Sequence, residues 1–149
     1  VACAAPLIVN EPGRIQYSAK KNPTLLSLAL GRFGWLRKIN ALSNYFYAHR
    51  NEHFSYVSDT FEAEYLSGCF MAIPYQLYIQ CGGFNPAYFL HLEDADFTRR
   101  LGRYGRTLHY PESVALHRWA RGSHKSVFQT YCLIRSILSY HRIWGLKLF

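Results

Sequence analysis

The order of apolar and polar residues divides the first part of the chain into short predicted elements. Residues 1–9 form a continuous apolar run that ends at Asn10, which predicts a buried strand. The following residues, 10–13 (NEPG), have the chemistry of a turn. Residues 25–30 contain leucines that predict a short helix ending at Gly31.

The segment of residues 32–62 has no clean period. It mixes polar residues with the aromatic residues Phe33, Trp35, Tyr45, Phe46, Tyr47, Phe54 and Tyr56. We therefore predict an irregular excursion with little helix. A loop of this length serves either as a functional lid or acceptor-binding segment, or as an aromatic-stabilised surface loop.

The middle of the chain predicts a strand, a turn region and a helix. Residues 65–73 (YLSGCFMAI) predict a buried strand stopped by Pro74, and residues 75–80 predict a short helix. The Gly82-Gly83 pair and Asn85-Pro86 then indicate turns.

Residues 89–105 (FLHLEDADFTRRLGRYG) predict a second helix. Phe97, Leu101 and Tyr104 would share one face of this helix, and Gly105 stands where a C-cap glycine belongs.

The last third of the chain predicts a strand followed by a long helix. Residues 107–116 predict a strand interrupted by Pro111, and residues 117–125 a polar loop. Residues 126–143 predict an amphipathic helix, and residues 126–149 as a whole form the C-terminal helical part. The expected inner stripe of this helix is Val127, Tyr131, Ile134, Leu138 and His141. Strands separated by helices predict an α/β unit with too few strands for a complete doubly wound sheet.

Composition and charge limit the possible classes of protein. With 149 residues and 50% hydrophobic content, the chain has the size of one domain with a buried core. The net charge of +8 favours an anionic partner, which could be nucleic acid, a membrane surface or a phosphorylated small molecule.

The cysteines and the chain start indicate the setting of the protein. None of the four cysteines forms a Cys-x-x-Cys pair, so we expect buried free thiols in a reducing compartment. No apolar stretch approaches the roughly 20 residues of a membrane-spanning helix. The first residues lack an initiating Met and the charged leader of a signal peptide, so we expect the chain to be part of a longer protein.

Three of the nine acidic residues, Glu93, Asp94 and Asp96, stand at the predicted start of the second helix. They either cap the helix and complement its dipole, or they do chemistry. A positioned carboxylate such as Asp94 could accept a proton from a hydroxyl nucleophile, while Glu93 binds a second hydroxyl. Asp94 and Asp96 would point about 200° apart, so we expect no metal pair, and Asp96 should cap the helix or pair with Arg99 or Arg100.

His117 follows the last predicted strand. Its ring either binds a divalent ion through one nitrogen or donates to the backbone. The next residues form either a site for a diphosphate or a solvated basic loop, and they include Arg118, Arg121, Ser123, His124 and Lys125.

The order of these features resembles the second half of glycosyltransferase family 2 enzymes with the GT-A fold, especially rhamnosyltransferase-like members that build bacterial polysaccharides. The elements that carry the resemblance are Ser67-Gly68, Gly82-Gly83-Phe84, Phe89, Glu93-Asp94-x-Asp96, Arg100, Gly105, Pro111 and His117. Residues 5–24 are similar to the middle segment of that family. Nearly the whole chain is covered, and residues 32–62 are the least typical.

The resemblance implies a partial GT-A-type, Rossmann-like mixed sheet with flanking helices. It implies that Asp94 is the catalytic base, that Glu93 binds the acceptor, and that His117 is a ligand to a divalent ion, Mg or Mn. Gly68 and the Gly82-Gly83 turn would shape the acceptor side of the cleft. Arg121 and Lys125 supply donors for the diphosphate of a nucleotide-sugar.

The implied reaction is an inverting transfer of a sugar, with rhamnose as one candidate, from a nucleotide-sugar to a saccharide or lipid-linked acceptor. It would take place in the cytoplasm or at the inner face of the membrane. The nucleotide-binding half of the family, with its Asp-x-Asp motif at a strand end, has no counterpart in these residues. We therefore expect weak metal binding and little or no activity from the isolated chain.

Two other functions compete with this one. The chain could be a noncatalytic basic module that binds nucleic acid or an anionic membrane, or a degenerate transferase half that keeps only an interaction role. The motif order favours the transferase, for which we expect no nucleic-acid partner. Trp144, Lys147 and Phe149 near the end of the last helix either touch a membrane or pack against the protein.

Overall fold

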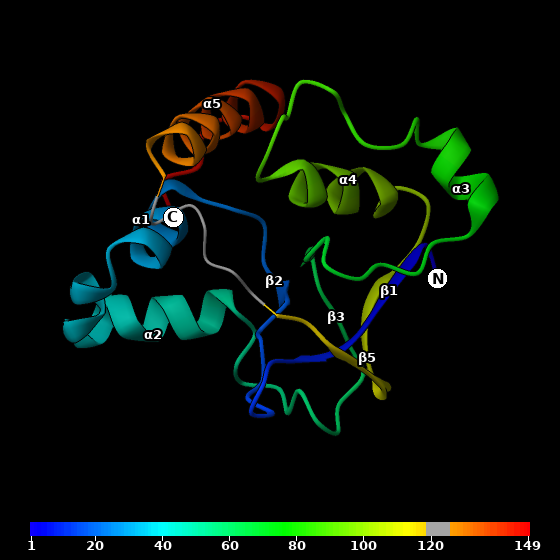
Figure 1. Cartoon of the computed structure of the whole chain (residues 1–149), viewed down its shortest axis with the longest axis horizontal. Coiled ribbons are helices and arrows are strands. Elements are labelled where there is room, and N and C mark those ends of the chain that lie inside the picture. The colour runs from blue at the N-terminus through cyan, green and yellow to red at the C-terminus, as the bar shows by residue number, and fades with distance from the viewer. Residues whose placement is uncertain (119–125) are drawn as a thin grey trace.

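A computed structural model of the chain describes residues 1–118 and 126–149. Figure 1 shows strands flanked by helices, in the order β1 (Cys3–Val9), β2 (Ala19–Lys20), α1 (Leu25–Arg32), the 3-10 helix η1 (Gly34–Lys38), α2 (Asn40–His49), β3 (Phe61–Glu62), β4 (Tyr65–Leu66), α3 (Tyr75–Gln80), α4 (Glu93–Leu101), β5 (Thr107–Leu116) and α5 (Val127–Trp144). The predicted α/β class with a mixed sheet and flanking helices is confirmed.

The main sheet has the strand order β1-β5-β3, with β5 parallel to β1 and antiparallel to β3. The register between β1 and β5 shifts after Pro6. Pro6 pairs with Tyr110, whereas the next residue, Leu7, pairs with Val114. The interruption predicted at Pro111 is therefore an irregularity inside one strand. Since β1 and β5 are parallel, both end at the same edge, where the His117 amide donates to the Val9 carbonyl at 2.8 Å.

Helix α4 lies between two apolar clusters. On one side, Phe97 and Leu101 are fully buried against residues of the strands, including Ala5, Leu7 and Leu66. On the other side, Leu92 and Ala95 pack with Tyr88 and with Tyr140 of α5. The amino end of α4 is thus enclosed between the strands and α5 (Figure 1).

Most of the predicted elements are present. The strand in residues 1–9, the turn after Asn10, the helices in residues 25–30 and 75–80 and the strand in residues 107–116 are confirmed. Asn85 forms the predicted turn, because its side chain accepts from the Ala87 amide and its carbonyl from the Tyr88 amide. All four cysteines are free thiols, but the predicted burial holds only for Cys3 and Cys132, because Cys69 and Cys81 are half-buried.

The prediction of little helix in residues 32–62 is wrong, because α2 spans ten of these residues. The helix is held by contacts with distant segments. The Tyr45 hydroxyl lies 2.7 Å from the Thr24 hydroxyl, and the His49 ring lies 3.1 Å from the Asn22 carbonyl. Tyr47 is exposed, so aromatic residues occupy both faces of α2 and hide its period.

The strand predicted for residues 65–73 is also wrong beyond its first two residues. β4 pairs with β2 at Tyr65 and Leu66 only, and the chain turns away after Ser67. Gly68 donates its amide to Asp94 of α4 at 2.8 Å instead of to a neighbouring strand. The chain returns to the sheet at Ala72, which forms an isolated bridge with Ala4.

The helix predicted over residues 89–105 is shorter at both ends, because residues 89–92 lie before α4. α4 ends at Leu101 with Gly102 in the C-cap position, so Gly105 is no cap. The predicted face is right for Phe97 and Leu101, which are buried, and wrong for Tyr104, which is exposed beyond the helix end.

The predicted inner stripe of the last helix faces outward. Val127, Tyr131, Ile134 and Leu138 are exposed, and His141 is only half-buried. The inner face of α5 instead carries Cys132, Ser136 and Tyr140. This orientation is set by hydrogen bonds, because the Ser136 hydroxyl donates to the Leu90 carbonyl at 2.6 Å and the Tyr140 hydroxyl to Asn22 at 3.2 Å.

The two clusters around α4 generate a stability prediction. Truncating the buried ring in Phe97→Ala should lower the free energy of unfolding by about 3–5 kcal/mol, because it removes apolar burial and leaves a cavity. Tyr104→Ala, a matched truncation at the exposed position, should cost less than about 1 kcal/mol. Urea titrations of the three proteins measure both values, and equal losses would contradict the described burial of α4.

Candidate active site

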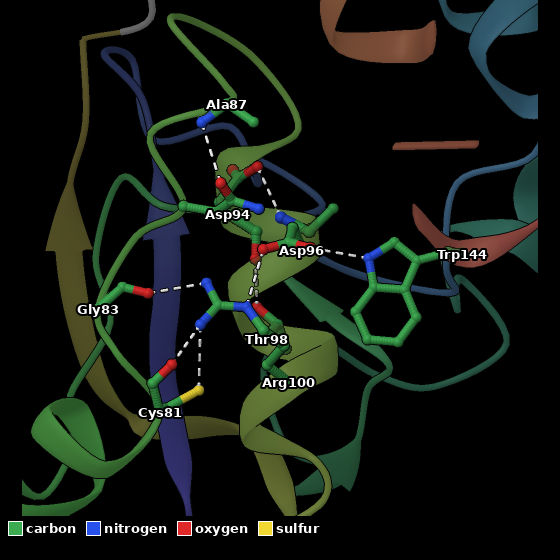
Figure 2. A network of polar contacts seen from close by, with 10 residues as sticks. Cys81, Gly83, Ala87, Asp94, Asp96, Thr98, Arg100 and Trp144 are labelled. Carbon is green, nitrogen blue, oxygen red and sulfur yellow. Dashed lines mark hydrogen bonds and ion pairs between the residues drawn. The ribbon is translucent and has the colours of Figure 1, made fainter. Parts of the chain in front are cut away.

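The segment before α4 reverses direction sharply. His91 and Leu92 both have left-handed backbone angles, with φ of 69° and 62°. Such angles are uncommon for residues other than glycine, and they concentrate where a structure holds a functional group in place. The reversal delivers Glu93 and Asp94 to the first turn of α4. Figure 2 shows Asp94 there.

The Asp94 carboxylate accepts hydrogen bonds from three donors. Its Oδ2 atom receives the Gly68 amide at 2.8 Å and the Tyr65 hydroxyl at 3.1 Å, and its Oδ1 atom receives the Ala95 amide at 2.9 Å. Only 9% of the residue is exposed. These bonds fix the orientation of the side chain, and no guanidinium forms an ion pair with it in the described part of the chain.

Gly68 can approach Asp94 this closely because it has no side chain. A Cβ atom added to Gly68 would lie 3.0 Å from the Asp94 Cβ and 3.5 Å from its Oδ2 atom. Gly68, which the resemblance implied would shape the acceptor side of a cleft, is therefore in direct contact with Asp94. Any larger residue at this position would push the carboxylate or the turn out of place.

A surface depression of about 360 Å³ begins at Gly68. Its other lining residues are mostly aromatic or apolar: Met71, Ile73, Tyr75, Tyr78 and Phe84. Ligand sites commonly combine such walls with a few polar groups. The neighbouring Asp94 carboxylate, which touches Gly68, is such a group.

Glu93 differs from Asp94 in its surroundings. Its carboxyl group is half-buried, and burial followed by the charge of Asp94 raises its pKa. Its Oε2 atom is buried without a hydrogen-bond partner among the described residues. The Nε2 atom of His91 is also buried without a hydrogen-bond partner among the described residues, and burial lowers the pKa of this histidine. Both groups are available to bond a hydroxyl that enters this site.

Asp96 points away from Asp94 and has a structural role. Its Oδ2 atom accepts from Arg100 Nε at 2.9 Å, and its Oδ1 atom accepts from Trp144 Nε1 at 2.8 Å (Figure 2). Of the expected alternatives, a helix cap or a pair with Arg99 or Arg100, the pair with Arg100 is the one that forms.

Arg100 ties the glycine turn to α4. Its guanidinium donates to the carbonyl oxygens of Cys81 and Gly83, the latter at 2.7 Å (Figure 2). Gly82 and Gly83 both have left-handed φ angles, of 76° and 63°, which glycine adopts without strain. Arg100 therefore links the glycine turn to the acidic residues of α4, because the same guanidinium forms the ion pair with Asp96.

Two side chains beside Asp94 were not predicted from the sequence. Tyr65 donates to the carboxylate, and burial followed by the Asp94 charge raises its pKa well above the ordinary value. Lys20 lies with its ammonium 5.1 Å from the centre of the Tyr65 ring. Burial lowers the Lys20 pKa, and the charge of Asp94 opposes this effect. No motif marks either residue, because both reach Asp94 from distant parts of the sequence.

His117 lies at the shared end of β1 and β5, where Gln16 fixes its ring. Gln16 donates from Nε2 to the His117 carbonyl at 2.6 Å, so its Oε1 atom, 3.0 Å from Nδ1, accepts the proton of that nitrogen. With Nδ1 as the donor, the lone pair of the neutral ring lies on Nε2, which forms no hydrogen bond within the described residues and fits a metal ligand.

The described residues supply only part of the predicted sites for a divalent ion and for a diphosphate. In residues 1–118 and 126–149, no group of three or more His, Cys, Asp or Glu residues could hold a metal ion. Within the same ranges, no hydrogen bond or ion pair joins His117 to the carboxylates of α4. Arg121 and Lys125 lie outside the described residues.

Comparison with known proteins finds similarity to rhamnosyltransferases. Over 75 residues, half of this chain, it is 35% identical to the rhamnosyltransferase WbbL of Escherichia coli (strain K12), of which it covers 28%. Over 123 residues, 79% of this chain, it is 29% identical to the N-acetylglucosaminyl-diphospho-decaprenol L-rhamnosyltransferase of Mycobacterium tuberculosis (strain ATCC 25618 / H37Rv), of which it covers 38%. The chain thus spans well under half the length of these curated relatives. No protein-family model and no solved structure matches the chain.

The contacts of Arg100 generate a prediction. Arg100→Ala leaves the fully buried Asp96 without its cation and frees the glycine turn, so the free energy of unfolding should fall by about 3 kcal/mol or more. Arg106→Ala is the matched control, because Arg106 is exposed and its ion pair with Glu62 spans 3.6 Å. That change should cost less than about 1 kcal/mol. Urea titration measures both, and a small loss in Arg100→Ala would refute its role as a tether.

Proposed function

We propose that the chain is the acceptor-side part of an inverting glycosyltransferase of family 2 with the GT-A fold. The supporting observation is the geometry of Asp94, a carboxylate fixed by three donors beside an aromatic-walled depression. Similarity to rhamnosyltransferases over 79% of the chain supports the same reaction class. Rhamnose is accordingly the proposed sugar.

In this proposal Asp94 acts as the general base. A hydroxyl group of the acceptor donates a hydrogen bond to the carboxylate, which takes the proton as the oxygen attacks the anomeric carbon of the donor sugar. The new bond between oxygen and carbon forms as the bond between the sugar and the nucleotide diphosphate breaks. Attack from the side opposite to the leaving group inverts the configuration.

Glu93 and the depression bind and orient the acceptor. The raised pKa of Glu93 makes its protonated form accessible at higher pH than usual, so the group can donate as well as accept a hydrogen bond. Its unpartnered Oε2 atom supplies one contact for a second hydroxyl of the acceptor. Tyr75, Tyr78 and Phe84 offer flat walls against which the apolar faces of a sugar ring can pack.

The donor side of the reaction would involve His117 and a divalent ion, Mg or Mn. A bound ion stabilises the negative charge that develops on the leaving diphosphate. Within residues 1–118 and 126–149, the lone pair on His117 Nε2 is the ligand that we propose for this ion, and a single ligand holds an ion weakly, so we expect weak binding to the 149 residues alone. Arg121 and Lys125 are proposed as donors to the diphosphate.

The acceptor is proposed to be a saccharide or a lipid-linked sugar. One relative is named for an acceptor that consists of a sugar diphosphate joined to decaprenol. Because the chain covers 28–38% of the relatives, we expect the nucleotide to bind mainly to parts of the full-length protein outside the matched region, and the 149 residues alone to be inactive or nearly so.

The base generates the central prediction. In the full-length protein, assayed against a panel of nucleotide-sugars, Asp94→Asn should lower turnover by at least about a hundredfold, because an amide cannot accept the proton. Asp59→Asn, at a half-buried aspartate that bonds Ser55 and Ser58 and does not line the depression, should leave turnover within about twofold of the unsubstituted protein. Near-normal turnover in Asp94→Asn would refute the assignment.

The metal site generates a separate prediction. His117→Ala should shift the metal titration of turnover in the full-length protein to concentrations at least about tenfold higher, because one ligand is lost. His53→Ala, at an exposed histidine, serves as the control. If both variants titrate like the unsubstituted protein, His117 does not bind the metal.

A further inference from the structure

Helix α5 carries an apolar face that points away from the protein. We call this the α5 apolar face. It consists of Val127, Phe128, Tyr131, Ile134 and Leu138, which are 54–89% exposed, together with Phe89 of the preceding loop, which is 71% exposed. The Phe89 and Phe128 rings touch edge to face, with centroids 5.9 Å apart, so the loop and the helix form one continuous surface.

The helix cannot roll to bury this face. Its opposite side is attached to the protein by hydrogen bonds from Ser136 to the Leu90 carbonyl, from Tyr140 to Asn22 and from Trp144 to Asp96. The Trp144 bond, at 2.8 Å, is made to a fully buried carboxylate. These bonds therefore fix the orientation of α5, with the α5 apolar face directed away from the rest of the 149 residues, and contiguous apolar surface of this kind marks an interaction site.

The charged residues of α5 and of the chain on both sides of it have one sign. Residues 113–149 contain six lysines and arginines and no aspartate or glutamate. Arg135 and Arg142 are exposed and stand seven residues apart, so they lie along the same edge of the helix. The apolar stripe is thus bordered by cations, without an acidic group in this part of the sequence to neutralise them.

We propose that the α5 apolar face lies in the interfacial layer of an anionic phospholipid bilayer. Aliphatic and aromatic side chains would enter the boundary between headgroups and acyl chains, while Arg135 and Arg142 reach the lipid phosphates. In residues 1–118 and 126–149, no helix is long and apolar enough to cross a membrane. The helix would lie along the surface.

A bilayer fits this face better than the other possible partners. A second copy of the chain would place the same cationic edge opposite the first, with no acidic residue in residues 113–149 to meet it. Nucleic acid would match the charge but not the exposed Val127, Ile134 and Leu138, which offer it no stacking or hydrogen bonding. Anionic lipid satisfies both the charge and the aliphatic side chains.

The position of the face connects the membrane to the candidate active site. Phe89 precedes Glu93 by four residues, and the inner side of α5 holds the same loop through Ser136 and Leu90. Docking would bring the acidic residues close to the bilayer, where a lipid-linked acceptor is found. This consequence rests on the proposed function, whereas docking itself does not.

Vesicle flotation of the full-length protein tests the proposal. The protein should bind vesicles of equal parts phosphatidylglycerol and phosphatidylcholine at least about tenfold more tightly than vesicles of phosphatidylcholine alone. High salt should weaken this binding, because it screens the arginines. The triple variant Val127→Ser, Ile134→Ser and Leu138→Ser should lose at least about tenfold in affinity, since three apolar side chains no longer insert.

A matched control replaces three other exposed aliphatic residues, as Val57→Ser, Ile79→Ser and Val114→Ser. It should bind vesicles like the unsubstituted protein. The double variant Arg135→Gln and Arg142→Gln keeps the apolar face and should lose the preference for anionic lipid. This variant tests the proposal independently if the triple variant folds poorly. Thermal melts monitor the fold of each variant.

The proposal is overturned if the protein stays unbound with anionic vesicles, or if the folded triple variant binds as tightly as its matched control. It is also overturned if the α5 apolar face is the contact of a dimer. In that case the protein would not bind vesicles, and sedimentation would show self-association that the triple variant abolishes. Asp94→Asn should bind vesicles normally, so failure of the base assignment and failure of docking are distinguishable.

Discussion

Two carboxylates buried in the first turn of α4 constrain the structure around them. Removing a carboxylate from water costs several kcal/mol unless donors replace the lost hydration, so neighbouring segments must bring such donors. Asp94 and Asp96 point to opposite sides of the helix and collect different partners. The Gly68 turn and Tyr65 serve Asp94, whereas Arg100 and Trp144 serve Asp96. The path of the chain on both sides of α4 follows from this requirement.

This arrangement gives the two acids different capacities. Asp96 is saturated by a guanidinium and an indole, and Arg100 carries the constraint onward to the Gly83 carbonyl. Asp94 is held by neutral donors beside a depression, and Glu93 keeps an unpartnered oxygen. A site of this kind is rigid before a ligand arrives, which reduces the entropy lost on binding and favours catalysis by positioning.

Helix α5 connects the candidate active site to the surface that we assign to lipid. Its inner side packs Tyr140 and Trp144 into the apolar cluster around Leu92 and Ala95 and forms hydrogen bonds through Ser136, Tyr140 and Trp144, and its outer side is the α5 apolar face. The helix is therefore apolar on both sides, whereas the surface helix of a water-soluble protein usually has one apolar stripe, which faces the core. The same helix therefore positions the loop before Glu93 and presents the surface that we assign to lipid.

The sequence by itself determined the elements whose signal is local. An apolar run predicted β1, and a turn motif predicted its end. Three acids before an apolar period predicted the start of α4. The spacing also made Arg99 and Arg100 the candidate partners of Asp96, and the structure selects Arg100, one helical turn away. Only the tertiary structure decided that α2 is helical and which side of α5 is buried. It also decided that Tyr65 bonds Asp94, that the Asp94 charge acts on Lys20, and that Gln16 bonds His117. Gln16 meets His117 across 101 residues, and Tyr65 meets Asp94 across 29. Periodicity reports that a helix has two unlike faces, but which face is covered depends on the hydrogen bonds and packing offered by residues far away in the chain.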